Sequence, residues 1–167
     1  MSDGFVLADE IVVRAPIERS FRLSTNLQIV QEVLRMRPVR GRTSGHVVEG
    51  DTVRWEGWQL GMPQVHESLI EAFAEPTFFR DRMMTGRFAW FEHDHQFIAR
   101  RDGTVLLRDE IRFAMPWGWP GARVGKWLIV PHIRRLIRKR LARLKELAEG
   151  DGWRRYLIDE QPAIILP

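Results

Sequence analysis

The stretch FRDRMMTGRFAWFEHDHQFIARRDGTVLLRDEIRFAM, residues 79–115, decides the fold. Glycine-containing breaks at residues 85–86 and 101–103 divide it into three runs rich in apolar and aromatic side chains. The second break contains Asp-Gly, a strong signal for a short hairpin because both residues tolerate the positive φ that such a turn needs. We therefore predict three successive antiparallel strands: one that ends at the first break, a second over residues 88–100 and a third over residues 104–115.

Each of these strands carries one row of side chains that is mainly apolar but includes ionisable groups, because side chains alternate between the two faces of a strand. The rows are Phe79, Asp81 and Met83; Phe91, His93, His95 and Phe97; and Leu107, Asp109, Ile111 and Phe113. We expect all three rows to face a common interior. Asp81, His93, His95 and Asp109 would then converge inside it.

The composition favours one domain that binds no nucleic acid. A length of 167 residues suits one domain, and a net charge of +4 is too modest to indicate a nucleic-acid surface. The absence of cysteine excludes a disulfide framework and a thiolate metal site. Residues 1–10 show no basic start followed by an apolar core, and no apolar run reaches the ~20 residues of a membrane span. We therefore expect a cytoplasmic protein.

Outside residues 79–115 the pattern predicts strands, two short helices and a long helix. The expected elements are a strand over residues 5–13, helices over 17–23 and 27–35, and strands over 42–49, 52–60 and 64–75. Pro38 and Gly41 should end the second helix. A long helix follows the turn at residues 117–121 and runs to Glu149, and Pro131 should kink or split it by removing a hydrogen bond.

The long helix has an apolar stripe at three- and four-residue spacing. The stripe consists of Ile133, Leu136, Ile137, Leu141, Leu144 and Ala148. Arg140 falls inside the arc of this stripe, so we predict that it extends inward to a carboxylate or to an anionic ligand group. The alternative is that it extends along its apolar stem to water. The other basic residues project elsewhere and would permit weak contact with an anionic membrane surface; they are Arg134, Arg135, Arg138, Lys139, Arg143 and Lys145.

The predicted order of elements, and several motifs, resemble a known superfamily. The motifs are Ala15-Pro16-Ile17-Glu18 with Phe21, Phe79-x-Asp81-x-Met83-x-x-Gly86-x-Phe88, Phe91-x-His93-x-His95-x-Phe97, and Gly103-Thr104 leading into Asp109. Over residues 5–148 the chain resembles the SRPBCC superfamily, which includes START lipid-binding domains, pollen-allergen-like proteins and polyketide cyclases. It looks most like the uncharacterised ligand-binding SRPBCC proteins.

This resemblance implies an α+β helix-grip fold, in which a curved antiparallel sheet of about seven strands wraps around the long C-terminal helix and leaves a deep cavity. It also implies a hydrophobic or amphipathic small molecule as the partner. Residues 1–150 would form the ligand-binding domain. The tail, residues 151–167, would dock on that domain or on a partner, which makes a homodimer one option. No phosphate-binding glycine pattern follows a strand, so we expect no nucleotide, haem or flavin cofactor.

The acids and histidines allow four interpretations. Carboxylates in an apolar interior are costly unless they are paired, so Asp81 and Asp109 each need a donor, and His93 and His95 are the nearest candidates. The four residues would form a satisfied polar network, orient a ligand headgroup, act as an acid–base pair, or hold a metal with a third ligand from one of the acids. We keep all four as catalytic candidates without assigning catalysis, and we assign no metal.

The residues expected to bind the ligand combine these polar groups with aromatic neighbours. They are Trp55, Asp81, Met83, Phe91, His93, His95, Asp109, Phe113, Trp117, Trp119 and Arg140. Trp55 and Trp127 are expected to pack in the core, whereas Trp117 and Trp119 flank the turn before the long helix and would gate the cavity.

Three functions follow from these expectations. The favoured one is non-enzymatic binding or carriage of a hydrophobic or amphipathic molecule. The second is an enzyme such as a polyketide cyclase or aromatase that uses the cavity acids and histidines for acid–base chemistry. The third is an interaction module that pairs with another copy through its apolar tail.

Overall fold

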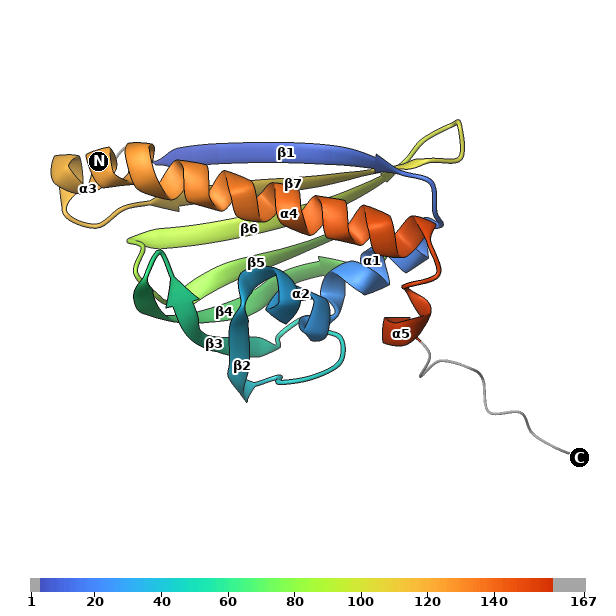
Figure 1. The fold of residues 1–167 in the computed structure, drawn as a ribbon, viewed down its shortest axis with the longest axis horizontal. Coiled ribbons are helices and arrows are strands. Elements are labelled where there is room, and N and C mark those ends of the chain that lie inside the picture. The colour runs from blue at the N-terminus through green and yellow to red at the C-terminus, as the bar shows by residue number, and fades with distance from the viewer. Residues whose placement is uncertain (1–3, 158–167) are drawn as a thin grey trace, which may run out of the picture.

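A seven-stranded antiparallel sheet curves around one long helix (Figure 1). The computed structural model describes residues 4–157, apart from the side chain of Trp119. The strands are β1 (Phe5–Val13), β2 (Met36–Gly41), β3 (Thr52–Gln59), β4 (Met62–Ala74), β5 (Phe78–Thr85), β6 (Trp90–Ala99) and β7 (Val105–Ala114). Their order in the sheet is β1-β7-β6-β5-β4-β3-β2, so the first strand lies beside the last and every other neighbour is consecutive in sequence.

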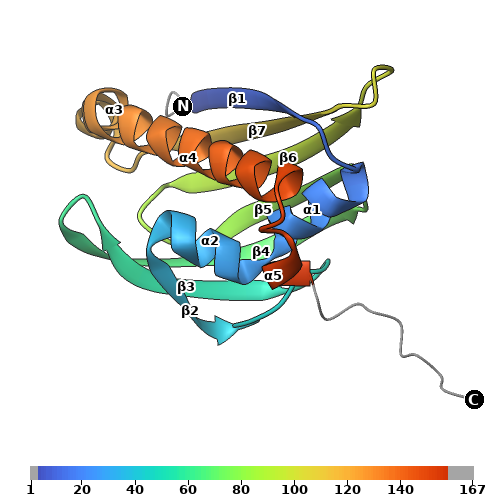
Figure 2. The same cartoon turned by 45° about the vertical axis from the view of Figure 1, so that its right-hand side comes forward.

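The helices cover one face of this sheet. They are α1 (Ile17–Thr25), α2 (Leu27–Leu34), α3 (Gly118–Val124), the π-helical turn η1 (Gly125–Ile129), α4 (Val130–Glu149) and α5 (Arg154–Leu157). α4 lies along the inner face beside β1, while α1 and α2 lie on the same face over the other half of the sheet (Figure 2). The predicted α+β helix-grip fold, with two short helices after the first strand, is confirmed.

The break between α1 and α2 has a local cause. The side-chain oxygen of Asn26 accepts hydrogen bonds from the backbone N–H groups of Gln28 (3.0 Å) and Ile29 (3.4 Å), which satisfies donors that lack a partner in the first turn of α2. Asn26 is therefore the N-cap that starts the second helix. This turn places α2 against β2 and also against α4, where Lys139 donates a hydrogen bond to the carbonyl of Val33.

The apolar interior is divided into two clusters. The larger lies between α1, α4 and strands β1, β5, β6 and β7, and Phe21 stands at its centre, with edge-on contacts to the rings of Phe73, Phe79 and Phe97. The smaller lies under α2 and consists of Leu27, Met36, Val47, Val53, Trp55 and Ile70. The space between two such clusters is where a cavity can persist.

The expected interruption near Pro131 is present, and it takes the form of the π-helical turn η1 followed by α4. Pro131 lies in the first turn of α4, where its missing N–H costs little. The first residue of η1, Gly125, has to be small because β1 lies close to it. A Cβ at this position would lie 2.6 Å from the ring of Phe5.

The prediction of a strand over residues 42–49 is wrong. β2 is Met36–Gly41 instead, so Pro38 and Gly41 lie inside a strand rather than ending a helix. α2 ends earlier because Arg35 adopts a left-handed conformation (φ 55°), which turns the chain directly into β2. β2 is an edge strand, and an edge position tolerates proline.

The expectation that Trp127 packs in the core is also wrong, because 75% of this residue is exposed. It belongs to η1, whose wider turn breaks the phase of the apolar stripe that runs through α4. Its ring lies beside the ammonium of Lys126, 5.4 Å from the ring centre. Trp55, in contrast, is buried as expected.

The start of the tail packs against the domain. Tyr156 in α5 is buried, and its hydroxyl donates a hydrogen bond to Glu32 (2.8 Å), while the guanidinium of Arg19 stacks over Trp153. The remainder of the predicted docking segment lies outside the described residues, so the boundary at residue 150 and the role of the tail stay predictions. Among the described helices, none has the length and apolarity needed to cross a bilayer.

Phe21→Ala tests whether the aromatic cluster holds α1 onto the sheet. Because Phe21 is only 1% exposed, we expect a loss of about 3–5 kcal/mol in the free energy of unfolding, measured by urea denaturation. The matched control, Trp58→Ala on the exposed face of β3, should change stability by no more than about 0.5 kcal/mol. Equal losses in the two variants would contradict this account of the core.

Candidate functional site

A cavity of about 360 Å³ lies between the two apolar clusters. Its walls come from the inner face of the sheet, from α2 and from the first half of α4. Most of the lining is apolar, with Trp55 and Ile70 from the smaller cluster and Phe79, Ile133 and Ile137 from the larger. The volume falls within the range of roughly 300–1,000 Å³ that is typical of small-molecule sites.

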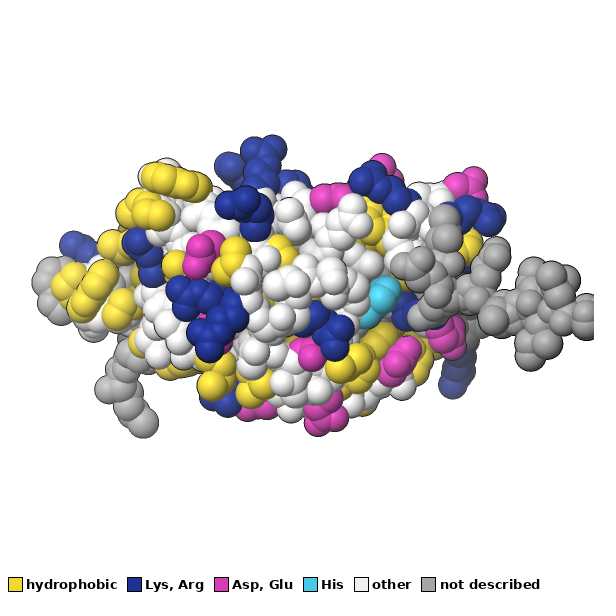
Figure 3. Space-filling view, turned by 90° about the horizontal axis from the view of Figure 1, so that it is seen from below, with side chains coloured by type: hydrophobic (Ala, Val, Ile, Leu, Met, Phe, Trp, Pro, Cys, Tyr) yellow, Lys and Arg dark blue, Asp and Glu magenta, His cyan; other side chains and the backbone are white. Residues whose placement is uncertain are grey.

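The open end of the cavity is surrounded by exposed apolar side chains. Leu60 and Met62, at the β3–β4 hairpin, and Trp117, Val124 and Leu128, around α3 and η1, both line the cavity and reach the surface. Hydrophobic side chains gather at the end of the molecule that carries α3 (Figure 3). A hydrophobic molecule could therefore enter at this end, where Arg87 is the charged residue of the cavity lining and is bonded to the hairpin.

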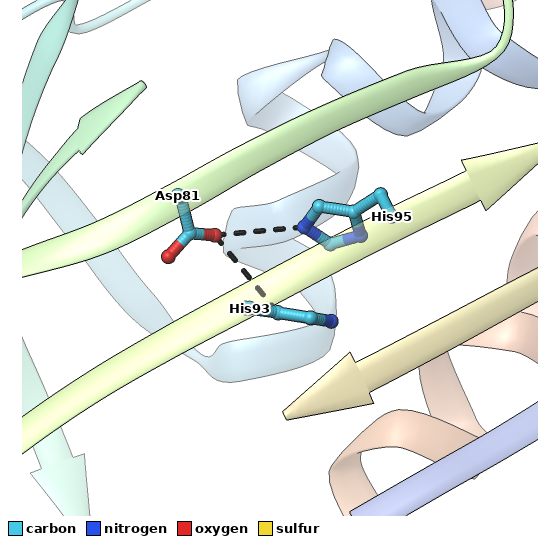
Figure 4. Close-up of side chains that lie close together, drawn as sticks. All are labelled: Asp81, His93 and His95. Carbon is cyan, nitrogen blue, oxygen red and sulfur yellow. Dashed lines mark ion pairs between the residues drawn. The ribbon is translucent and has the colours of Figure 1, made fainter. Parts of the chain in front are cut away.

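Strand register brings the acids and histidines together at the cavity wall. Asp81 on β5 stands directly opposite His93 on β6, and His95 on β6 stands directly opposite Asp109 on β7. Opposite residues of antiparallel strands share a face, so all four side chains project inward. Figure 4 shows the carboxylate of Asp81 directed at both imidazoles. The predicted convergence of these four residues is therefore observed.

Asp109 is the anchor of this cluster. Its carboxylate accepts hydrogen bonds from Nη1 of Arg140 (2.6 Å) and from Nδ1 of His95 (2.9 Å), and Arg140 also donates to the hydroxyl of Ser24. Burial opposes ionisation, but the charge of Arg140 and the contacts with His95 and His93 outweigh it and hold the pKa of Asp109 well below its usual range. The prediction that Arg140 extends inward to a carboxylate is confirmed.

Asp81 and His93 are less tightly held. Oδ2 of Asp81 lies 3.5 Å from Nε2 of His95 and 3.9 Å from Nδ1 of His93. Burial of Asp81 favours its neutral form, yet its contacts with His95 and His93 outweigh burial and lower its pKa. Burial, together with the adjacent His95, lowers the pKa of His93 and favours its neutral imidazole. Nε2 of His93 is buried and has no hydrogen-bond partner in the structure.

Several polar residues of the cavity wall were not anticipated from the sequence, and His66 and Ser24 are the two that lie nearest to the acids and histidines. His66 on β4 lines the cavity, its ring meets Phe91 edge-on, and burial lowers its pKa. Alternation along β4 places His66, Ser68 and Ile70 on one face, so this signal was present in the sequence. The hydroxyl of Ser24 accepts a hydrogen bond from Arg140. No sequence pattern indicates this contact, because it depends on how α1 packs against α4.

Most of the residues expected to bind a ligand lie on the cavity wall. These are Trp55, Asp81, Phe91, His93, His95, Trp117 and Arg140. Asp109 lies behind the lining as the partner of His95 and Arg140, Met83 lies against Gly86, and Phe113 stacks on Phe5 in the core. The side chain of Trp119 lies outside the described part of the structure. A ligand-binding role for any of these residues stays a prediction.

The chemistry available at this end of the cavity is that of imidazole and carboxylate. A neutral His93 and a charged Asp81 can accept hydrogen bonds from a ligand or exchange a proton with it. Asp81, His93 and His95 are also the described residues whose metal-ligating atoms lie within 4.8 Å of one another. The same three side chains can therefore orient a polar group, move a proton or hold a cation.

Arg140→Met tests the anchor. It leaves the Asp109 carboxylate buried without its main counter-charge, so we expect a loss of about 3–5 kcal/mol in the free energy of unfolding. The double variant Arg140→Met/Asp109→Leu should recover much of this loss, because it removes the unpaired charge. Arg134→Met, at an exposed position on the same helix, is the control. A single variant as stable as this control would show that the pair does not hold α4 to the sheet.

Comparison with family models and with characterised proteins gives no sequence match. Comparison with solved structures gives many. A protein of Thermus thermophilus shares 18% identity at a TM-score of 0.68, covering 93% of this chain and 99% of its own. A START superfamily protein from Mycobacterium smegmatis shares 15% identity at a TM-score of 0.64. The match covers 85% of this chain and 98% of the other. The Zhui aromatase/cyclase from Streptomyces sp. R1128 shares 9% identity at a TM-score of 0.68. The match covers 90% of this chain and 99% of the other.

At these identities the likeness concerns the fold. The neighbours include a START superfamily protein, Ara h 8.0201 and an aromatase/cyclase, which are the kinds of protein that the sequence motifs indicated. The resemblance to the SRPBCC superfamily is thus confirmed in the fold: this chain has the helix-grip architecture of those proteins, with a cavity between its sheet and its last long helix.

Proposed function

We propose that this protein binds or carries a hydrophobic or amphipathic small molecule in the cavity, with the apolar part of that molecule against α2 and α4 and a polar group against Asp81 and the two histidines. The observation that carries the proposal is the cavity itself, which has apolar walls, one open end and ionisable side chains on the wall. Apolar lining with a few convergent polar groups is the usual composition of a small-molecule site.

The arrangement of polar groups supports an amphipathic rather than a purely apolar occupant. The wall of the cavity contains His66, Asp81, His93 and His95, and Arg140 borders it. Polar groups in such a place cost free energy unless they are paired, and those of Asp81 and His93 are incompletely paired within the chain. A hydroxyl, carbonyl or amine on the bound molecule would satisfy them.

A second function, a cyclase- or aromatase-like enzyme, is supported by one feature of the site. Burial and the adjacent His95 lower the pKa of His93, which favours its neutral form, and contacts with the histidines lower the pKa of Asp81; such a pair on the cavity wall suits general acid–base catalysis. The structural likeness to the Zhui aromatase/cyclase is consistent with this alternative. We assign no catalytic residue, and binding without chemistry stays the favoured function.

The remaining partner expectations stay proposals. Weak membrane contact through the basic face of α4 competes with ion pairs on that face, since Arg138 pairs with Asp9 and Lys145 with Glu149. Homodimer formation through the tail and a cytoplasmic location are likewise proposed rather than observed.

Val30→Trp tests the binding function. Val30 lines the cavity from α2, so the larger side chain should occupy space that the ligand needs. We expect the wild-type protein, purified from cells and examined by native mass spectrometry, to carry a bound molecule, and the variant to carry at least tenfold less. Val6→Trp, at an exposed position on β1, should bind as the wild type does. A wild-type protein without any bound mass, which also fails to bind a fluorescent fatty acid, would contradict the proposal.

His93→Gln, combined with His95→Gln, separates a binding protein from an enzyme. Glutamine keeps hydrogen-bonding capacity but cannot exchange protons, so a binding protein should keep much of its affinity for the recovered molecule. An enzyme should instead lose about 10²–10⁴-fold in turnover of that molecule, followed by mass change. His132→Gln, on the cavity wall but bonded to Gln59, is the control. If no variant and no wild-type sample converts the molecule, the enzymatic alternative is rejected.

A further inference from the structure

We propose that Asp81, His93 and His95 form a binding site for a divalent transition-metal ion, Zn²⁺ by its donor preference, in the wall of the cavity. These residues come from the adjacent strands β5 and β6, and their side chains are directed toward one another (Figure 4). The site does not depend on which molecule occupies the apolar part of the cavity. It uses the side chains that the proposed function places against the polar group of the ligand, but Zn²⁺ binding tests it directly and without any ligand.

The spacing of the three donors fits a shared cation better than it fits direct hydrogen bonds. Oδ2 of Asp81 lies 3.5 Å from Nε2 of His95 and 3.9 Å from Nδ1 of His93. Both distances exceed the roughly 2.7–3.2 Å of an ordinary N–H···O hydrogen bond. Zinc bonds of about 2.0–2.2 Å in tetrahedral geometry place neighbouring donors about 3.3–3.5 Å apart. The ligand atoms of the three residues lie within 4.8 Å of one another, so side-chain rotations would have to bring them closer to reach that spacing.

The groups behind the two histidines are those that a metal site requires. A ligating histidine usually donates its other ring N–H to a carboxylate, which fixes the ring and raises its basicity. Nδ1 of His95 donates to Oδ1 of Asp109 (2.9 Å), which leaves Nε2 directed at Asp81. Nε2 of His93 lies 3.7 Å from the same oxygen, on the far side of the ring from the Nδ1 that lies near Asp81. Asp109 thus holds the imidazole of His95 by a hydrogen bond and lies close to the outer nitrogen of His93 without bonding it.

Asp109 can hold this supporting position because it is itself fixed. Arg140 donates to its other oxygen, Oδ2 (2.6 Å), so Oδ1 stays available to the histidines. Nε2 of His93, which is buried without a hydrogen-bond partner, would gain Asp109 as its acceptor when Nδ1 binds a cation. The site therefore explains a buried polar atom that the chain alone leaves unsatisfied.

The donor set also selects the kind of ion. Two imidazoles and one carboxylate suit zinc and its neighbours in the first transition series, whereas Mg²⁺ and Ca²⁺ prefer oxygen ligands. Three protein ligands leave a coordination position open, and all three residues line the cavity. An oxygen or nitrogen of a bound molecule could occupy that position, so the metal would favour occupants that carry such a donor.

Titration of the tag-free, chelator-treated protein with Zn²⁺ tests the site. We expect isothermal titration calorimetry to saturate at one ion per chain, and Co²⁺ to give visible absorption bands of a low-coordinate site that Zn²⁺ abolishes. Asp81→Asn and His93→Gln should each weaken Zn²⁺ binding at least tenfold. His132→Gln, which changes another histidine of the same cavity, should bind like the wild type.

The outcomes separate the site from surface binding and from unfolding. Circular dichroism of each metal-free variant shows whether it is folded. Asp81→Asn keeps the shape of the side chain, so its Zn²⁺ affinity tests the site if His93→Gln does not fold. Wild-type protein that binds no Zn²⁺, a folded Asp81→Asn that binds as tightly as the wild type, or an equal loss in His132→Gln would each overturn the proposal. These measurements follow Zn²⁺ itself, so they give a result even if the protein carries no hydrophobic molecule.

Discussion

The ion pair between Asp109 and Arg140 is the constraint on which the rest of the structure depends. It joins the middle of β7 to the middle of α4 and is almost completely excluded from solvent. A buried pair of this kind contributes little net stability compared with apolar packing, but either charge left alone would be strongly destabilising. The pair therefore selects one arrangement of helix on sheet, because any other position of α4 leaves Asp109 without its partner.

The same constraint explains why the cavity wall carries polar groups. One carboxylate oxygen of Asp109 accepts a hydrogen bond from Arg140, and the other accepts one from His95. His95 in turn lies next to His93 and Asp81. These groups cannot pack against apolar side chains without losing partners, so the larger cluster stops at them and the smaller cluster under α2 begins beyond the cavity. The cavity lies between the two apolar clusters, and Phe73 packs against both of them.

Strands β5, β6 and β7 also carry a second charge network on their outer face. Asp94, which lies between His93 and His95 in sequence, accepts from Arg80 (2.5 Å) and Arg112 (2.9 Å) on that face. The outer arginines pair with carboxylates, although Nε of Arg82, Arg108 and Arg112 lacks a hydrogen-bond partner, and on the inner face Nε2 of His93 lacks one. Alternation along one strand thus separates an outer network of arginines and carboxylates from an inner network of imidazoles and carboxylates on the cavity wall.

The sequence by itself determined the elements whose signals are local: the strand rows of residues 79–115, the apolar stripe of α4, and the inward position of Arg140 within that stripe. It failed where a neighbour overrides a local signal. Arg35 turns α2 directly into β2, and the π turn η1 carries Trp127 out to solvent. Only the tertiary structure decided that Asp109 lies behind the cavity wall while Asp81 lies on it, and that His66 and Ser24 join the site. The reason is physical: alternation and periodicity fix the face on which a side chain lies, but partners and cavity volume depend on the register and packing of elements distant in sequence.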